Sequence, residues 1–211
     1  CAVHIEVLAS NVTVAGQPLV IKALALNFAL EVDEYFRPKT RAEWHPECHS
    51  CEGVELEGTT EISAVEGVAE FTDLSIAVVG AYNLSVFFPG SSGYDLGVPD
   101  VVTFEFQVVN AAPSNLSIVV QPGTGIQGRP LSVQPVLAIF DMFGNPVLNE
   151  NEFLVIANGT ASIQGFEAEV RGGFANFVNL TEFLSAECLS GACGPIPKQH
   201  LSFSLYQNPR N

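Results

Sequence analysis

The stretch Gly67-Val68-Ala69-Glu70-Phe71-Thr72-Asp73-Leu74 returns in altered form as Gly173-Phe174-Ala175-Asn176-Phe177-Val178-Asn179-Leu180. Upstream in each half, Val14–Leu19 and Ile126–Leu131 share a second pattern, Gly-x-Pro-Leu. The repeat units of solenoid proteins are about 20 to 50 residues long. These stretches recur at roughly half the length of the 211-residue chain. The sequence therefore predicts one domain that has been duplicated, over residues 1–111 and 112–211.

Both halves are rich in short apolar or alternating segments that end at Gly, Pro or Asn, and none has a clear helical period. Several short strands with turn signals between them are typical of an all-β sandwich, so we expect one sandwich in each half. The expected strands are Val3–Val7, Leu19–Leu30, Phe71–Val79, Tyr82–Phe88, Val101–Val109, Leu116–Val120, Leu131–Phe140, Glu152–Ala157, Phe166–Val170, Phe174–Val178 and Leu201–Tyr206.

The predicted boundary between the halves is the short segment Asn110–Ser114, in which Pro113 restricts the backbone. We therefore expect a stiff joint between the two domains. Aligning Asp33 with Asp141 leaves a longer polar stretch in the first half, which predicts an insertion at about 33–58 in the first domain.

The charge balance excludes several classes of partner. Eight Lys and Arg against 23 Asp and Glu give a net charge of −15, so the chain cannot coat a nucleic acid or an anionic membrane surface. No apolar run approaches the roughly 18 residues of a membrane span, so we expect no membrane insertion in this segment. A solvated acidic surface is the main interpretation of the charge, and specific calcium binding is the alternative, without an EF-hand loop. No cofactor is expected.

Five Asn-x-Ser/Thr sequons favour a secreted glycoprotein with covalently attached glycans. In Tyr82–Val86 the large apolar residues alternate with Asn83, which places Asn83 on the outward face of a strand. Asn115 follows the same rule before Leu116. The alternative is that these asparagines are ordinary polar positions. The predicted glycosylation sites are Asn11, Asn83, Asn115, Asn158 and Asn179.

Five cysteines predict disulfides in an oxidising compartment. Cys48 and Cys51 are close enough to close one small loop, and Cys188 and Cys193 another. Cys1 is left over, which makes it a candidate for a bond to another chain.

A zinc site is the alternative for the first cysteine pair, because His45 and His49 lie within the same few residues as Cys48 and Cys51. Structural zinc usually joins two ligand pairs that are well separated in sequence, so we favour the disulfide. The chain starts at Cys1 without an initiator Met, which we interpret as a processed or excised part of a longer protein.

Two quoted stretches carry a resemblance to a known family. Asp141-Met142-Phe143-Gly144-Asn145-Pro146-Val147 resembles the Asp-x-x-Gly-Asn-Pro-Val stretch of the immunoglobulin-fold repeats of the invasin/intimin and filamin-like type. Gly67–Ile76 followed by Gly80–Leu84 resembles their later strands, including a Gly-x-Tyr corner. The second half departs from the pattern after Leu180. The resemblance implies two tandem immunoglobulin-like sandwiches, as in extracellular surface and fibre glycoproteins.

The sequence predicts a protein that is not an enzyme. It contains no nucleophile elbow, no zinc-protease motif and no phosphate loop, although a Ser-His-Asp triad stays open because its members meet only in the folded chain. Our first hypothesis is an extracellular structural subunit that self-associates head to tail into a surface filament. Its candidate docking patch is Arg37, Lys39 and Arg41 with Trp44 nearby, and a solvated loop is the alternative for the cluster.

The second hypothesis is an adhesion or receptor ectodomain that binds a protein or a glycan on another cell. Its aromatic anchors would be Trp44 and Tyr35 in the predicted insertion. Trp44 could equally cap the core of its own domain.

Overall fold

The computed structural model describes residues 4–27, 29–34, 37, 39–88, 101–126, 128–149, 152–159, 162–183 and 201–208. The chain divides into two compact units, Cys1–Ala111 and Ala112–Asn211, each with a hydrophobic core of its own. The expected all-β fold is confirmed. Among the described residues, strands are joined by turns and by one short 3-10 helix, η1 (His49–Cys51).

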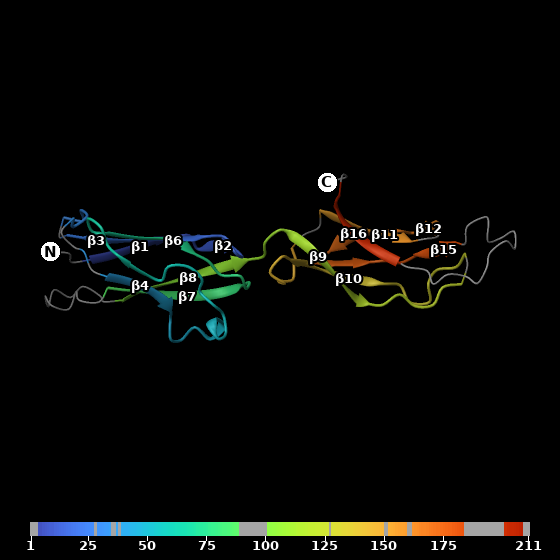
Figure 1. Ribbon diagram of the computed structural model, residues 1–211, viewed down its shortest axis with the longest axis horizontal. Helices are drawn as coiled ribbons and strands as arrows, with labels where there is room; N and C mark the ends of the chain where they lie inside the picture. The colour runs from blue at the N-terminus through green and yellow to red at the C-terminus, as the bar shows by residue number, and fades with distance from the viewer. Residues whose placement is uncertain are drawn as a thin grey trace. The chain divides into compact units, whose positions relative to one another are not determined.

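The first unit is a sandwich whose two sheets lie face to face (Figure 1). One sheet has the strand order β1-β3-β6, and the other has the order β2-β8-β7-β4-β5. All pairs are antiparallel except β2 and β8, which run parallel. The strands of this unit are β1 (His4–Ala9), β2 (Val12–Val14), β3 (Leu19–Leu26), β4 (Lys39–Trp44), β5 (Glu61–Ser63), β6 (Val68–Leu74), β7 (Gly80–Phe87) and β8 (Val101–Val109).

The second unit has one sheet with the strand order β16-β11-β13-β14-β10-β9, and a small separate pair of β12 with β15. The two edge strands, β9 and β16, approach each other but form no ladder among the described residues. The strands are β9 (Pro113–Val120), β10 (Val136–Asp141), β11 (Phe153–Gly159), β12 (Ser162–Gln164), β13 (Glu167–Arg171), β14 (Phe174–Asn176), β15 (Thr181–Phe183) and β16 (Leu201–Gln207).

The repeated stretch starts a strand at the same place in both units, although β6 continues to Leu74 and β14 ends at Asn176. Its alternate apolar residues are buried in each core: Ala69, Phe71 and Leu74 in the first unit, and Ala175, Phe177 and Leu180 in the second. Each stretch starts with a left-handed glycine, Gly67 with φ 77° and Gly173 with φ 81°. A Cβ at either glycine would lie within 2.6 Å of a backbone carbonyl oxygen, so only glycine lets the two backbone segments come this close.

The turn after β3 matches the turn after β10. The Asn27 side-chain Oδ1 accepts hydrogen bonds from the Ala29 and Glu31 amides at 2.8 and 3.1 Å. The Asp141 Oδ1 accepts from the Phe143 and Asn145 amides at 2.9 and 2.8 Å. Asn27 is therefore the counterpart of Asp141, and the alignment of Asp33 with Asp141 is wrong. The Asn27 turn also ends β3 at Leu26, so the strand expected over Leu19–Leu30 is shorter than predicted.

The extra residues of the first unit lie later than the predicted insertion at 33–58. In the first unit Thr40 of β4 pairs with Ile62 of β5, and in the second Val155 of β11 pairs with Ala168 of β13. Strand β4 is thus the counterpart of β11 rather than part of an insertion. The additional residues fall between Trp44 and Glu61, and they include Cys48 and Cys51.

Candidate interaction surfaces

The basic residues of the candidate docking patch lie on or beside β4. Lys39 and Arg41 point away from the core, because the residue between them, Thr40, is fully buried. Lys39 Nζ lies 2.7 Å from Glu61 Oε1, and Arg41 Nε lies 3.0 Å from Glu43 Oε2. Arg41 also covers the Phe87 ring at 5.4 Å.

Lys39 and Arg41 therefore each have an acidic neighbour on the same face of the sheet. The hydrogen bond and the charge of Glu61 raise the pKa of Lys39, and the same contact lowers the pKa of Glu61. Arg37 is exposed just before the strand. Docking by this cluster stays a prediction, and a partner would have to compete with the acidic neighbours.

Trp44 does not lie with these cations. Its ring stacks on Tyr82 with the centroids 5.3 Å apart, and Tyr82 is buried in the core. Its indole Nε1 donates to the carbonyl oxygen of Val54 at 3.0 Å. Trp44 therefore closes the core of its own unit and anchors the segment after β4, so it is not an exposed aromatic anchor. Tyr35 lies outside the described residues.

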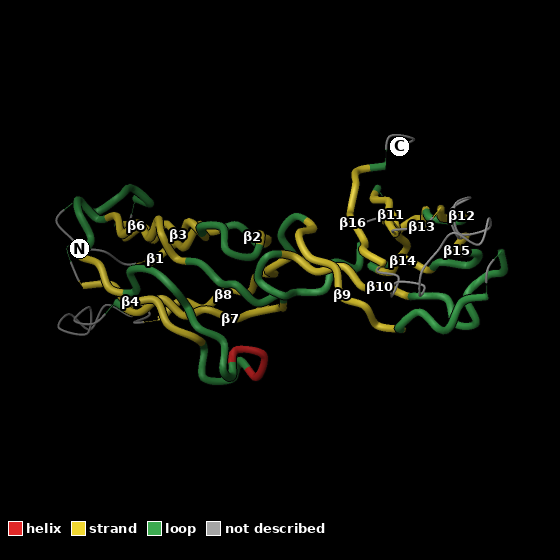
Figure 2. The backbone as a smooth tube through the Cα atoms, turned by 45° about the vertical axis from the view of Figure 1, so that its right-hand side comes forward, coloured by secondary structure: helices red, strands yellow, loops and turns green. Residues whose placement is uncertain are grey.

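The segment after β4 covers part of β7. A disulfide joins Cys48 and Cys51, which is the pairing that their spacing favours over zinc binding. The Asn83 amide donates to Cys48 Sγ at 3.5 Å, and the Ser50 hydroxyl donates to the Ala81 carbonyl oxygen. Strand β4 ends beside this part of β7, so the disulfide turn shields the backbone edge that β4 leaves open. Figure 2 shows the turn as the red helical segment of the first unit.

The predicted glycosylation sites differ in exposure. The side chains of Asn11, Asn115, Asn158 and Asn179 are exposed, and Asn83 is half-buried beside the disulfide turn. In β7 the apolar residues Tyr82, Leu84 and Val86 are buried as expected, and Ser85 between them is also fully buried. Exposure leaves room for a glycan at four of the sites, and glycosylation itself stays a prediction. Cys1, Cys188 and Cys193 lie outside the described residues.

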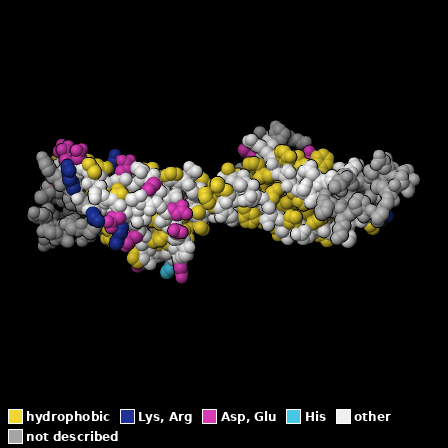
Figure 3. Space-filling view, viewed as in Figure 1, with side chains coloured by type: hydrophobic (Ala, Val, Ile, Leu, Met, Phe, Trp, Pro, Cys, Tyr) yellow, Lys and Arg dark blue, Asp and Glu magenta, His cyan; other side chains and the backbone are white. Residues whose placement is uncertain are grey.

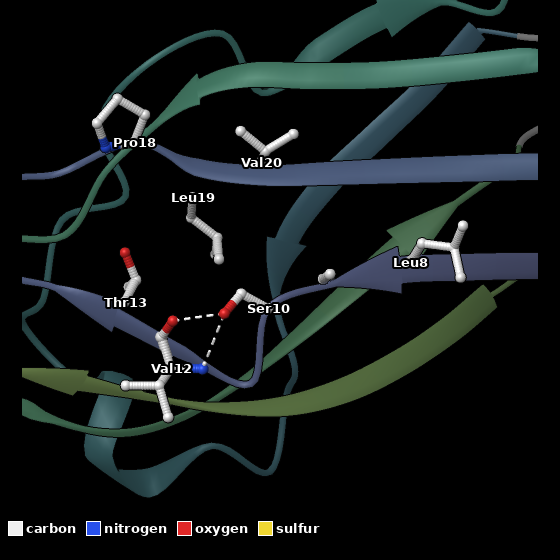
Figure 4. Close-up of a pocket in the computed structure, with 8 residues that line it drawn as sticks. Leu8, Ser10, Val12, Thr13, Pro18, Leu19 and Val20 are labelled. Carbon is white, nitrogen blue, oxygen red and sulfur yellow. Dashed lines mark hydrogen bonds between the residues drawn. The ribbon is translucent and has the colours of Figure 1, made fainter.

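A shallow hollow of about 510 Å³ opens in the first unit where β1 passes into β2. The Ser10 hydroxyl stabilises the turn between the two strands. It donates to the Val12 carbonyl oxygen at 2.6 Å and accepts from the Val12 amide at 3.3 Å (Figure 4). Leu8, Val12 and Val20 on its wall are about half exposed. The wall contains no ionisable side chain, and its polar side chains are the hydroxyls of Ser10 and Thr13.

The described residues contain no group of three or more His, Cys, Asp or Glu side chains that could hold a metal. The pKa of Asp73 is lowered because its carboxylate accepts from the Thr59 hydroxyl at 2.7 Å and from the Thr59 amide at 3.0 Å. The part of the chain that the structure describes also has no helix with the length and hydrophobicity that a bilayer crossing requires.

Comparison with known proteins identifies the fold. No protein-family model and no curated protein matches the chain. Among solved structures, the Escherichia coli adhesin FdeC aligns over 85% of this chain with a TM-score of 0.51 and 13% sequence identity. FdeC is built of immunoglobulin-like domains. The fold of this chain is immunoglobulin-like. The chain spans about half of the FdeC structure, 56%.

Two further structures are similar at lower scores. Invasin, a bacterial integrin-binding protein, aligns over 96% of this chain and 36% of its own, with a TM-score of 0.38 and 11% identity. Trypsin-activated alpha-2-macroglobulin from Escherichia coli aligns over 97% of this chain and 17% of its own, with a TM-score of 0.40 and 9% identity. These scores are too low to carry an argument about function.

The second immunoglobulin-like unit has a surface that the sequence pattern did not predict. Strand β16 pairs with β11 as β7 pairs with β4: Phe203 faces Ala157, and Val86 faces Ala42. In the first unit β7 is paired on its other side with β8. In the second unit, β16 is the last strand of the sheet among the described residues. Figure 3 shows hydrophobic side chains exposed on this unit.

Proposed function

We propose that this chain belongs to a non-enzymatic extracellular glycoprotein and acts as a structural subunit that assembles into a surface fibre. The observation that carries the proposal is the pair of immunoglobulin-like units, each with its own core, whose sequon asparagines Asn11, Asn115, Asn158 and Asn179 are exposed. Support for a non-enzymatic role comes from the described ionisable residues, such as Asp73 and Glu61, whose contacts stabilise loops and strand pairs.

Covalently attached glycans are part of this proposal. Asn11, Asn115, Asn158 and Asn179 are exposed and can carry a glycan without unfolding either unit. Bulky sugars on these positions would keep strands outside the contact region from pairing with other chains. Mass spectrometry of native peptides tests this part: the proposal expects glycan masses on most of the five sequons, and bare asparagines throughout would contradict it.

Electron microscopy of the native protein tests assembly. The proposal expects regular filaments that persist after purification under non-reducing conditions. Only short, monodisperse particles would contradict fibre assembly.

A second candidate function is adhesion to a protein or glycan on another cell. It is favoured by the similarity in fold to FdeC, an adhesin. This candidate expects monodisperse particles in the microscope and saturable binding of the purified protein to cells. Electron micrographs and a cell-binding assay together therefore distinguish fibre assembly from adhesion.

A further inference from the structure

The hollow between β1 and β2 lies where the chain changes from one sheet of the first unit to the other. Strand β1 pairs with β3 as far as Ala9. The chain then crosses at Ser10 and Asn11, and β2 pairs with β8 of the opposite sheet. The first two residues of β3, Leu19 and Val20, therefore have no β1 residue paired with them, and both line the hollow.

The second unit pairs the same part of this edge with its own chain. Counted from the leucine of the shared Gly-x-Pro-Leu pattern, Ser132 is the counterpart of Val20. The Ser132 amide donates to the Thr124 carbonyl oxygen at 3.1 Å, and the two hydroxyls lie 3.3 Å apart. The Gly123 amide donates to the Val133 carbonyl oxygen at 2.8 Å. This position is thus paired and polar in the second unit, whereas in the first unit it is apolar and lines a hollow.

The wall of the hollow exposes several apolar side chains together. Leu8, Val12 and Val20 have exposed fractions of 47, 45 and 48%, and Leu19 between them is 1% exposed. Single exposed apolar residues are common, but a concave group of them with a few polar atoms is typical of a ligand site. The volume of about 510 Å³ is also in the range of sites for small ligands.

The sequon Asn11-Val12-Thr13 borders this hollow directly. Ser10 and Val12, the residues on either side of Asn11, both line the wall, and consecutive Cα atoms are only about 3.8 Å apart. The Asn11 carbonyl oxygen accepts from the Gln107 amide at 2.9 Å, which holds this backbone in place, and the Asn11 side chain is exposed. A sugar attached to Asn11 therefore starts at the rim of the hollow.

We propose that the hollow is the binding site of the N-linked glycan on Asn11. The Asn11 Nδ2 nitrogen bonds to C1 of the first N-acetylglucosamine, one amide proton is released, and the lipid diphosphate of the sugar donor leaves. The C–H face of the sugar and its acetamido methyl group then pack against Leu8 and Val20, which removes apolar surface from water.

The polar side of the hollow suits the same sugar. The Thr13 hydroxyl has no hydrogen-bond partner in the part of the chain that the structure describes, and Figure 4 shows it on the side of β2 toward Leu19. It is therefore available to a hydroxyl or acetamido group of the sugar. The inference rests on the proposed function for the presence of the glycan, and it adds where the sugar lies and which unit it stabilises.

The test uses the full chain from a eukaryotic host, trimmed enzymatically to one N-acetylglucosamine at each occupied sequon. Trp44 is the sole tryptophan and stacks on Tyr82 of the first unit, so its fluorescence reports the unfolding of that unit. We expect Asn11→Gln to lower the melting temperature by about 4 °C. The control Asn158→Gln removes a sugar from the second unit and should leave this transition unchanged. A melting temperature that Asn11→Gln does not lower would overturn the inference.

A second pair of variants separates contact in the hollow from a general effect of the sugar. Val20→Ser introduces the residue type of the second unit on the wall, and Val78→Ser changes a side chain of similar exposure, 46%, that does not line the hollow. Loss of the Asn11 sugar should lower the melting temperature at most half as much in Val20→Ser as in Val78→Ser. Equal effects of the sugar in the two variants would overturn the inference.

NMR of the trimmed protein gives a direct structural readout. We expect nuclear Overhauser effects from the acetamido methyl group of the Asn11 sugar to the methyl groups of Leu8 and Val20. A sugar on Asn11 without these contacts would overturn the inference and leave the proposed function intact. A bare Asn11 in a native protein whose other sequons carry glycans would do the same. Bare asparagines at all five sequons would instead contradict the proposed function itself.

Discussion

Leu30 and Gly144 occupy the same position in two copies of one turn. Leu30 has φ 59° and Gly144 has φ 85°, and each amide donates to the carbonyl oxygen of the residue that starts its turn, Asn27 or Asp141, at 3.0 and 3.2 Å. The left-handed conformation is unfavourable for leucine by about 1–2 kcal/mol and is readily adopted by glycine. The first unit thus contains strain that the second avoids.

Replacing Leu30 by glycine should stabilise the first unit. Relief of the backbone strain exceeds the extra flexibility that glycine gives the unfolded chain, so we expect a gain of about 0.5–1 kcal/mol. The Leu30 side chain is 71% exposed, so little packing is lost. Urea denaturation measures the change. As a matched control, Gly144→Ala should destabilise the second unit by about 1 kcal/mol. An unchanged or lower stability of the Leu30→Gly variant would show that the turn is not strained.

A side chain at Gly173 should destabilise the second unit more than a side chain at its neighbour Gly172. A Cβ at Gly173 would lie 2.6 Å from the Val147 carbonyl oxygen, whereas one at Gly172 would meet nothing within 4 Å. Both residues have positive φ. We expect Gly172→Ala to cost about 1 kcal/mol from backbone strain alone, and Gly173→Ala to cost about 2–4 kcal/mol because the carbonyl must also move. Equal losses in urea denaturation would contradict the close approach.

The disulfide turn should respond to reductant and not to a chelator. Closing so small a loop limits the unfolded chain only modestly, so reduction of the bond between Cys48 and Cys51 should cost about 2 kcal/mol. The amide of Asn83 should then exchange faster with solvent, because the turn no longer covers this part of β7. Free thiols at Cys48 and Cys51 in the native protein, together with a melting temperature that a chelator lowers, would instead favour the zinc alternative.

The pKa of Asp73 should rise when the Thr59 hydroxyl is removed. In the folded chain the two hydrogen bonds from Thr59 hold this pKa below its ordinary value. The contact therefore stabilises the fold above the ordinary pKa, and this contribution is lost as the pH falls through the lowered pKa. In Thr59→Val the amide hydrogen bond remains and the hydroxyl bond is gone, so the pKa should move part of the way back. Titration followed by NMR measures it, and an unchanged pKa would contradict the role of the hydroxyl.

The sequence predicted the features that depend on local pattern. Gly67 and Gly173 mark the duplication, because both need a left-handed backbone, and the alternation around Tyr82 and Leu84 predicted which side of β7 is buried. The spacing of Cys48 and Cys51 predicted their pairing.

Other features depend on contacts between residues that are far apart in the sequence, and local sequence patterns do not predict such contacts. The Asn27 turn shares almost no residue type with the Asp141 turn, since only an oxygen acceptor at the first position is required. Strand β4 was missed because its outward residues Lys39 and Arg41 are charged and two of its inward residues, Thr40 and Ala42, are small. The place of β16 as the last strand of its sheet among the described residues could not be predicted, because strand order is set by pairings between residues far apart in the chain.

Hydrogen exchange of the isolated chain tests the central structural claim, that β16 pairs only with β11 in the part of the chain that the structure describes. Residues Leu84–Phe87 of β7 pair with strands on both sides, so all of their amides should exchange slowly. In Leu201–Leu205 only every second amide, the ones directed at β11, should be slow. Slow exchange of consecutive amides throughout Leu201–Leu205 would contradict the account, because it would mean that the edge is already paired.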